Sequence, residues 1–247
     1  MLDQPGSGRF DALGLYASGI DTSDYAAKAA PLLREAVGGF GDFLDVGAGG
    51  GQLGRALRDP GCSWTAIEPA PVMRARLAAP GGPSRIIACG WQEAAGLGRF
   101  DTVLAANMPA PLQAPLPFLA RCRGWSSGPV AWLVPAQHGP RGLCLAGCLP
   151  AEWHGEDETP GVDIVLAALG EAHRPDGSRL IDWTFSLVVA DIGPLAAYLA
   201  DRLGWRDTDE RRPALAARLE GLAETDAGGR RLNVPRRSAL LTWGCKT

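Results

Sequence analysis

Residues 43–54 contain the feature that most constrains the fold, an apolar strand that runs directly into a cluster of glycines and then into a helix. Four of the five residues after the strand are glycine, and the apolar positions beyond them recur at helical spacing. Glycine allows positive φ and close approach of the backbone to a ligand, and the helix offers unpaired N–H groups at its positive end. The stretch therefore predicts a nucleotide site in an α/β fold.

Two classes of cofactor use such a turn, and both patterns are present. Gly49 to Gly54 satisfies G-x-G-x-x-G, the pattern of dinucleotide sites. Asp45 to Gly51 satisfies D-x-G-x-G-x-G, which resembles the first motif of class I S-adenosylmethionine-dependent methyltransferases. We favour the second interpretation because Asp45 puts a carboxylate in an apolar strand end, where an ammonium group of the cofactor would compensate its charge. Alternatively, Asp45 caps the helix or accepts hydrogen bonds from loop amides.

The resemblance implies a doubly wound α/β fold, with a seven-stranded, mostly parallel sheet, an antiparallel last strand and helices on both faces. It covers residues 40–134 best, and the remainder follows by topology, with an insert after the fifth strand. The resemblance also implies S-adenosylmethionine as the cofactor. Around the glycine turn, the implied cofactor-binding residues are Asp45, Gly47, Ala48, Gly49 and Gly51.

A second acidic residue, Glu68, ends the second predicted strand, 17 residues beyond Gly51. A carboxylate at this place can accept hydrogen bonds from both ribose hydroxyls of either cofactor. The sequence Ile67-Glu68-Pro69 resembles the second methyltransferase motif, in which the residue after the acid packs on the adenine. Helix capping by Glu68 is the alternative.

The loop after the third predicted strand, residues 89–93, is the expected adenine loop. The resemblance implies an acidic residue directly after Gly90, but this chain has Trp91 there. We expect Gln92 to supply the polar contact to the adenine and Trp91 to form an apolar wall. A purely structural tryptophan is the alternative.

Asn107 and His138 follow the fourth and fifth predicted strands, at the sheet edge where doubly wound sheets bind ligands. Residues 107–110 partly resemble the N-P-P-Y element of amino-methylating enzymes but lack its second proline and its aromatic residue. By position, we predict that Asn107 contacts the cofactor and the reaction centre. His138 is the candidate base on the acceptor side, with a structural role as the alternative.

Two regions are set apart from the predicted core. Residues 1–38 are expected to form an N-terminal helical lid segment, with a helix from Tyr25 to Val37, before a methyltransferase-like domain in residues 39–247. Residues 139–178 are longer than a simple crossover requires, so we predict an insert that determines acceptor specificity.

Composition limits the partners and the location. The chain of 247 residues carries 24 basic and 27 acidic side chains, a net charge of −3, so no sequence-wide attraction to nucleic acid is expected and a small-molecule acceptor is favoured. The start lacks the pattern of a signal peptide, and no apolar run is long enough to span a membrane, which predicts a cytoplasmic protein without a membrane partner.

Cys144, Cys148 and His154 lack a fourth spaced ligand, so no metal is expected.

The leading hypothesis is transfer of a methyl group from S-adenosylmethionine to a small molecule by in-line displacement. A non-catalytic S-adenosylmethionine-binding module is one alternative. The other is an NAD(P)-dependent oxidoreductase that uses Gly49, Gly51 and Gly54, although the second half of the chain has no Tyr-x-x-x-Lys pair.

Overall fold

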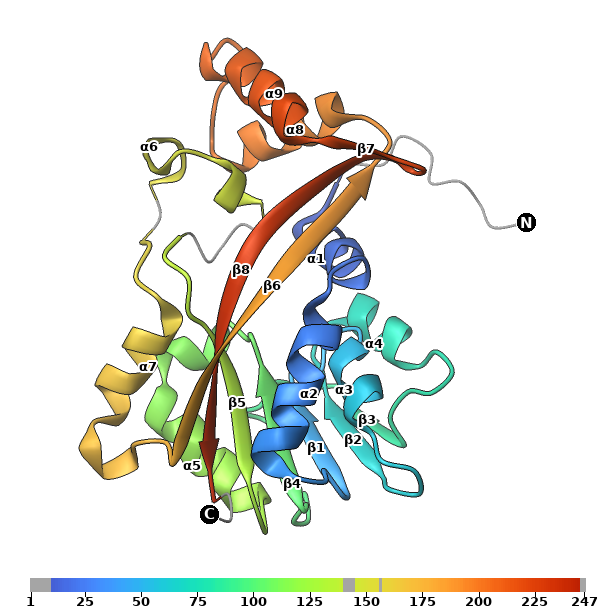
Figure 1. Cartoon of the computed structure of the whole chain (residues 1–247), viewed down its shortest axis with the longest axis vertical. Helices are drawn as coiled ribbons and strands as arrows, with labels where there is room; N and C mark the ends of the chain where they lie inside the picture. The colour runs from blue at the N-terminus through green and yellow to red at the C-terminus, as the bar shows by residue number, and fades with distance from the viewer. Residues whose placement is uncertain (1–9, 140–144, 156, 245–247) are drawn as a thin grey trace.

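One mixed sheet forms the centre of the protein (Figure 1). The computed structural model describes residues 10–139, 145–155 and 157–244. The strands are β1 (Phe43–Val46), β2 (Trp64–Ile67), β3 (Arg85–Ile87), β4 (Thr102–Ala106), β5 (Val130–Pro135), β6 (Gly177–Val189), β7 (Glu224–Asp226) and β8 (Gly229–Trp243). Their order in the sheet is β3-β2-β1-β4-β5-β8-β6, and β7 pairs with β8 beside this path.

Strands β1 to β5 pair in parallel, whereas β8 runs antiparallel between β5 and β6. This arrangement confirms the predicted doubly wound sheet with an antiparallel last strand. The additional strand, β7, has three residues and forms a hairpin with β8 in which Asp226 faces Gly229. It adds to the seven principal strands without changing their topology.

Helices cover both faces of the sheet, as predicted. The α-helices are α1 (Ala12–Asp21), α2 (Tyr25–Val37), α3 (Gln52–Leu57), α4 (Pro71–Leu77), α5 (Pro115–Trp125), α6 (Ala151–His154), α7 (Gly161–Leu169), α8 (Ile192–Arg202) and α9 (Arg211–Leu222). Three short 3-10 helices are η1 (Ala110–Gln113), η2 (Ala146–Cys148) and η3 (Glu171–His173). None of the helices within the described ranges combines the length and the apolar character that crossing a membrane requires.

Alternation along β1 divides its side chains between two hydrophobic layers. Phe43 belongs to the layer that includes residues of α2 and α3, and Leu44 to the layer that includes residues of α5 and α7. A strand buried on both faces is apolar almost throughout, and all four residues of β1 are buried. Asp45 alone breaks the apolar run, two residues after Phe43 and therefore on the face covered by α2.

Helix α2 has the predicted bounds, whereas α1 was not predicted from the sequence. Gly14 and Gly19 lower the helix propensity of residues 12–21. Tertiary contacts offset this loss, since Asp11 caps the helix by accepting from the Gly14 N–H (2.7 Å) and Gly19 lies directly against the ring of Phe185 in β6. An added Cβ at Gly19 would lie 2.0 Å from that ring, so the glycine is what allows α1 to approach β6.

Strands β6 and β8 continue as a two-stranded ribbon beyond the end of β5. Pairing of β5 with β8 stops at Pro135 and Ser238, but β6 and β8 remain paired as far as Val189 and Arg230. Figure 1 shows the ribbon rising away from the parallel strands, with α8 and α9 at its far end. Helix α7, in contrast, packs beside α5 and β5 as an ordinary crossover helix. That residues 139–178 determine acceptor specificity stays a prediction.

Candidate functional site

The glycine turn between β1 and α3 adopts the backbone conformation that its sequence predicts. Gly47, Gly49 and Gly51 have φ values of 68°, 57° and 82°, in the left-handed region that glycine occupies at little cost. A Cβ at Gly47 would lie 2.4 Å from the sulfur of Met108, whereas nothing lies within 4 Å of the equivalent position at Gly49. The backbone at Gly49 is therefore open to a ligand. Ala48, between them, is half-buried and packs against the apolar layer.

Gly54 has a packing role. A Cβ at this position would lie 2.2 Å from the ring of Trp64, which is fully buried and stacks on Phe43 with ring centroids 5.8 Å apart. The absence of a side chain lets α3 lie close to β2. Gly54 thus fixes the helix that follows the turn, and this packing is common to both cofactor interpretations.

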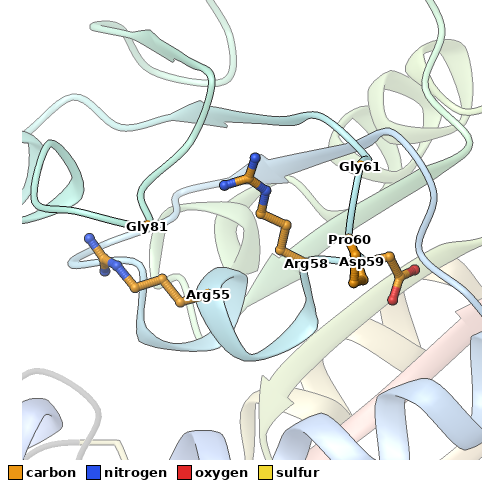
Figure 2. A pocket seen from close by; sticks show the side chains of 6 residues that line it. All are labelled: Arg55, Arg58, Asp59, Pro60, Gly61 and Gly81. Carbon is orange, nitrogen blue, oxygen red and sulfur yellow. The ribbon is translucent and has the colours of Figure 1, made fainter.

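Arg55 ties the turn to the neighbouring helix. Its guanidinium donates to the carbonyl oxygen of Gly50 (2.7 Å) and to that of Arg76 at the end of α4 (2.8 Å). Arg55 also lines a surface depression of about 390 Å³, together with Arg58, Asp59, Pro60, Gly61 and Gly81. Figure 2 shows how these residues lie around it. None of the predicted site residues lines this depression, so it is separate from the candidate site.

Asp45 is buried in the sheet, and no cation among the described residues pairs with it. Its exposed fraction is 2%, and burial raises the pKa of this carboxyl from 3.8 to about 7, with a further increase from the charge of Glu68. The indole N–H of Trp64 lowers the pKa of Asp45 slightly, but it does not reach hydrogen-bonding geometry. In the described chain no backbone amide donates to Asp45, and α3 has no side-chain cap, so the capping alternative is not found.

Glu68 lies at the end of β2, next to the turn, and is 6% exposed. Its Oε2 accepts from the Gly49 N–H (2.9 Å), and its Oε1 accepts from the N–H of Ala70, which precedes α4 (2.8 Å). A carboxylate has about four acceptor positions, so two are left for a ligand. Glu68 therefore supports the local turn and can also accept hydrogen bonds from a diol. Pro69, beside it, is exposed.

Tyr25 of α2 lies on the same face of the sheet as Asp45. Its ring packs on Trp183 with centroids 4.7 Å apart, and its hydroxyl is buried without a hydrogen-bond partner in the described part of the chain. Burial raises the pKa of Tyr25 well above its ordinary value, and Tyr16 and Asp45 raise it further. An unpaired buried hydroxyl and two buried carboxyls around one turn fit a ligand with a cationic and hydrogen-bonding end.

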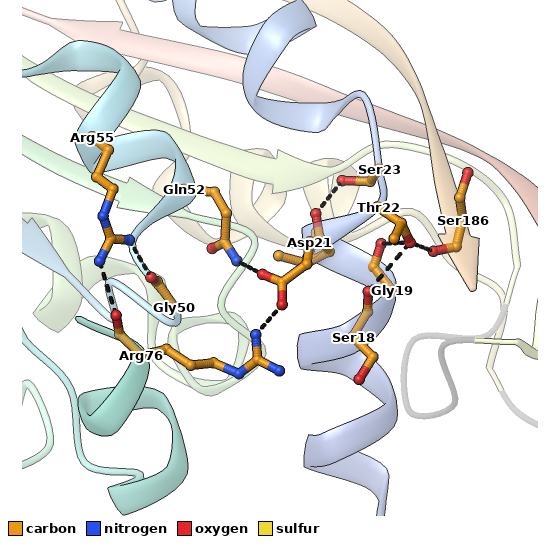
Figure 3. Close-up of polar contacts among 11 residues, drawn as sticks. Ser18, Gly19, Asp21, Thr22, Ser23, Gly50, Gln52, Arg55, Arg76 and Ser186 are labelled. Carbon is orange, nitrogen blue, oxygen red and sulfur yellow. Dashed lines mark hydrogen bonds and ion pairs between the residues drawn. The ribbon is translucent and has the colours of Figure 1, made fainter. Parts of the chain in front are cut away.

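The end of α1 is attached to the helices on either side of the turn (Figure 3). The carboxylate of Asp21 accepts from the amide of Gln52, the first residue of α3, and from the guanidinium of Arg76 in α4. The hydroxyl of Thr22 donates to the carbonyl oxygen of Ser186 in β6. The C-terminal end of α1 is thereby fastened to α3 and α4 through Asp21 and to β6 through Thr22.

Because these contacts are on the surface, we expect Asp21→Ala to loosen α1 locally. Partly exposed ion pairs contribute about 1 kcal/mol or less, so the free energy of unfolding should change little, while amide exchange in α1 should become several-fold faster. Hydrogen exchange measured by mass spectrometry checks this result. Glu171→Ala removes the exposed ion pair with Arg174 and is the matched control, which should leave exchange in α1 unchanged.

Asn107 occupies the end of β4 in a strained conformation. Its φ of 50° is the single positive value at a non-glycine residue in the described ranges. The side-chain Oδ1 accepts from the hydroxyl of Ser238 in β8 (3.0 Å), which in turn accepts from the indole N–H of Trp183 (3.1 Å). Backbone strain of this kind persists where surrounding structure enforces it and is common at functional sites. Ser238 was not identified from the sequence because its partner is distant along the chain.

The remaining predicted residues are more dispersed. Trp91 is 7% exposed, and its ring meets Phe118 in the layer below the sheet at a centroid distance of 5.1 Å. Trp91 therefore has a packing contact in the core, and its predicted role as a wall of the adenine site stays a prediction. Gln92 and His138 are exposed. His138 makes no side-chain hydrogen bond to any described residue. Cys144 lies outside those residues, and no group of three metal-ligating side chains occurs within them.

No protein-family model and no curated protein matches this chain. Among solved structures, a candidate type II methyltransferase from Anaeromyxobacter dehalogenans superposes with a TM-score of 0.51 and 16% identity, over 86% of this chain and 93% of that one. YjhP from E. coli aligns over 94% of this chain and all of that one, with 15% identity and a TM-score of 0.48.

A third solved structure is magnesium protoporphyrin IX methyltransferase from Synechocystis PCC 6803 with bound S-adenosylmethionine. It aligns at 14% identity and a TM-score of 0.39, over 53% of this chain and 66% of that one. The strand order, the antiparallel β8 and the first of these superpositions together show that the chain has the class I methyltransferase fold.

Proposed function

We propose that this protein is an S-adenosylmethionine-dependent methyltransferase acting on a small molecule. The observation that carries the proposal is the pair of buried carboxyls, Asp45 and Glu68, on either side of a glycine turn whose backbone is open at Gly49. A cofactor with a ribose diol and an ammonium group satisfies both carboxyls. A small-molecule acceptor accords with the net charge of −3 and with the ion pairs formed by arginines near the C-terminus, such as Arg230 and Arg231.

Each part of the site has a distinct role in this proposal. Glu68 binds the ribose hydroxyls, and the negative charge of Asp45 compensates the positive charge of the cofactor's amino group. The glycine turn lets the backbone lie against the cofactor. Gly47, Ala48 and Gly51 set the shape of this turn. Pro69, Trp91 and Gln92 stay predictions for the adenine end. When bound, S-adenosylmethionine supplies a methyl group on a sulfonium leaving group. The protein aligns the acceptor and excludes water.

The acceptor side lies where β4 and β5 end. Asn107 is held there by Ser238, and His138 follows β5 as the candidate base, which is needed only if the acceptor loses a proton. Residues 1–38 act as a lid in this proposal, and residues 139–178 contribute to acceptor specificity together with the ribbon of β6 and β8.

Calorimetric titration with S-adenosylmethionine, S-adenosylhomocysteine (SAH) and NAD(H) tests the proposal. We expect micromolar binding of the two sulfur ligands, lost in Glu68→Ala, and no binding of NAD(H). Binding of NAD(H) alone would overturn the assignment. Release of SAH in an acceptor screen then separates an enzyme from a non-catalytic binding module, which would bind the cofactor and turn over no acceptor.

A further inference from the structure

A chain of two hydrogen bonds links Trp183 through Ser238 to Asn107. Which group donates in each bond follows from the donors and acceptors that the side chains carry. An indole N–H can only donate, so the Ser238 hydroxyl oxygen is the acceptor of the 3.1 Å contact with Trp183. Ser238 is 1% exposed, and its single hydroxyl proton therefore requires an acceptor inside the protein. Oδ1 of Asn107, at 3.0 Å, is that acceptor.

The opposite orientation of the Asn107 amide would place N–H groups against Ser238. The hydroxyl oxygen could accept from both neighbours, but its own proton would be buried without a partner, which disfavours that orientation. The orientation with Oδ1 toward Ser238 is thus the satisfied one. It leaves the two N–H donors of Asn107 free, because no residue in the described ranges accepts from them.

We infer that Ser238 and Trp183 are positioning residues that hold the Asn107 amide as a hydrogen-bond donor at the end of β4, so that the acceptor molecule carries a carboxylate or carbonyl oxygen. The inference rests on the proposed function, because it concerns the acceptor side of the same site. An N–H donor binds such an oxygen but cannot accept from an amine.

Asn107→Asp tests the orientation, because aspartate has the same shape but presents oxygen on both sides. With Oδ1 facing Ser238 in the wild type, the variant keeps the contact with Ser238 and changes only the outward group from donor to acceptor. We expect a melting temperature within about 2 °C of the wild type, which corresponds to less than about 1 kcal/mol. This measurement shows that the variant stays folded. A preference for an ammonium probe shared by wild type and variant would mean that an N–H of Asn107 faces Ser238, and would overturn the inference.

Benzoate and benzylamine are matched probes for the outward group, since they differ in the charged end and share the ring. Titrated into SAH-saturated protein, benzoate should bind at least about tenfold more tightly than benzylamine. A tenfold difference in affinity is what one hydrogen bond to a charged group contributes. Asn107→Asp should reverse this preference. Equal or stronger binding of benzylamine by the wild type, or failure of benzoate to bind, would contradict the proposed acceptor class.

Ser238→Ala and Ser238→Thr separate positioning from mere packing. The alanine variant should lose most of the preference for benzoate, whereas threonine keeps a hydroxyl and should restore it. Titration of SAH into each variant keeps this test separate from that of the proposed function. Loss of SAH binding by the wild type would refute the methyltransferase proposal, whereas intact SAH binding with a preference for the amine refutes only the inference about Asn107.

Discussion

Replacing Asp45 with asparagine is expected to weaken SAH binding by at least about 30-fold at pH 8, because removal of one partner from a buried charge pair costs about 2–5 kcal/mol. The same change should stabilise the protein without ligand. Asp45 is buried with no cation partner among the described residues, and burial raises its pKa to about 7, so the charged form is disfavoured in the folded state. The two effects have opposite sign, which distinguishes a binding role from a structural one.

The pH dependence of stability follows from the same carboxyl. Between pH 4 and 7 the folded protein holds the Asp45 proton that the unfolded chain releases, so this group makes stability fall as pH rises through that window. The difference between the folded and ordinary pKa corresponds to roughly 4 kcal/mol when complete. Asp45→Asn should remove this dependence, and thermal melts of both proteins from pH 4 to 8 measure it.

Cofactor binding has the opposite pH dependence. An ammonium group pairs with ionised Asp45, so SAH affinity of the wild type should rise about tenfold per pH unit up to pH 7 and then level off. Asp226→Asn is the control, since Asp226 is a partly exposed carboxylate at the β7–β8 hairpin, paired with Arg231. It should leave the affinity and its pH profile unchanged. A flat profile in the wild type would show that Asp45 does not meet the cationic group.

Replacing Gly54 with alanine is expected to destabilise the fold by about 1–3 kcal/mol, the usual result of overpacking a core. The new methyl group would lie 2.2 Å from Trp64, which is fully buried and stacked on Phe43, so neither ring can move away freely. Urea unfolding measures the change. SAH affinity should fall as well, because α3 would be displaced from β2 and the glycine turn is continuous with α3.

Gly221→Ala is the matched control. Gly221 lies in α9, and nothing lies within 4 Å of its Cβ position. The same substitution there removes the conformational freedom of glycine in a helix and should stabilise the protein by about 0.5–1 kcal/mol. If the two variants lost equal stability, tight packing between Gly54 and Trp64 would not be the cause.

The order of the strands around the glycine turn could be predicted because it follows from patterns of residues that are neighbours in the sequence. The strand before the glycine turn, the acid at the end of β2 and the apolar strand before the C-terminus each depend on residues adjacent in sequence. Helix α1 could not be predicted, because its glycines oppose a helix and its stability comes from contact with Phe185 in β6. Propensity is a weak guide where tertiary packing decides.

In the site, too, residues marked by a local pattern could be predicted, whereas those set by tertiary contacts could not. Asp45 and Glu68 were identifiable because a carboxylate in an apolar strand is conspicuous. The contact of Ser238 with Asn107 joins residues 131 positions apart and depends on the register of β5 with β8. The positive φ of Asn107 is likewise set by its surroundings. The sequence allows Trp91 to contact the cofactor or to pack in the core. The structure adds its ring contact with Phe118, and its role at the adenine end stays a prediction.

A crystal structure of the protein with SAH tests the central claim most directly. We predict that SAH lies against the glycine turn at the carboxyl ends of β1 and β2, with its ribose hydroxyls on Glu68 and its amino group toward Asp45. Density for SAH elsewhere, such as the depression beside Arg55 and Arg58, would contradict the account. So would a complex in which the Glu68 carboxylate bonds only to Gly49 and Ala70.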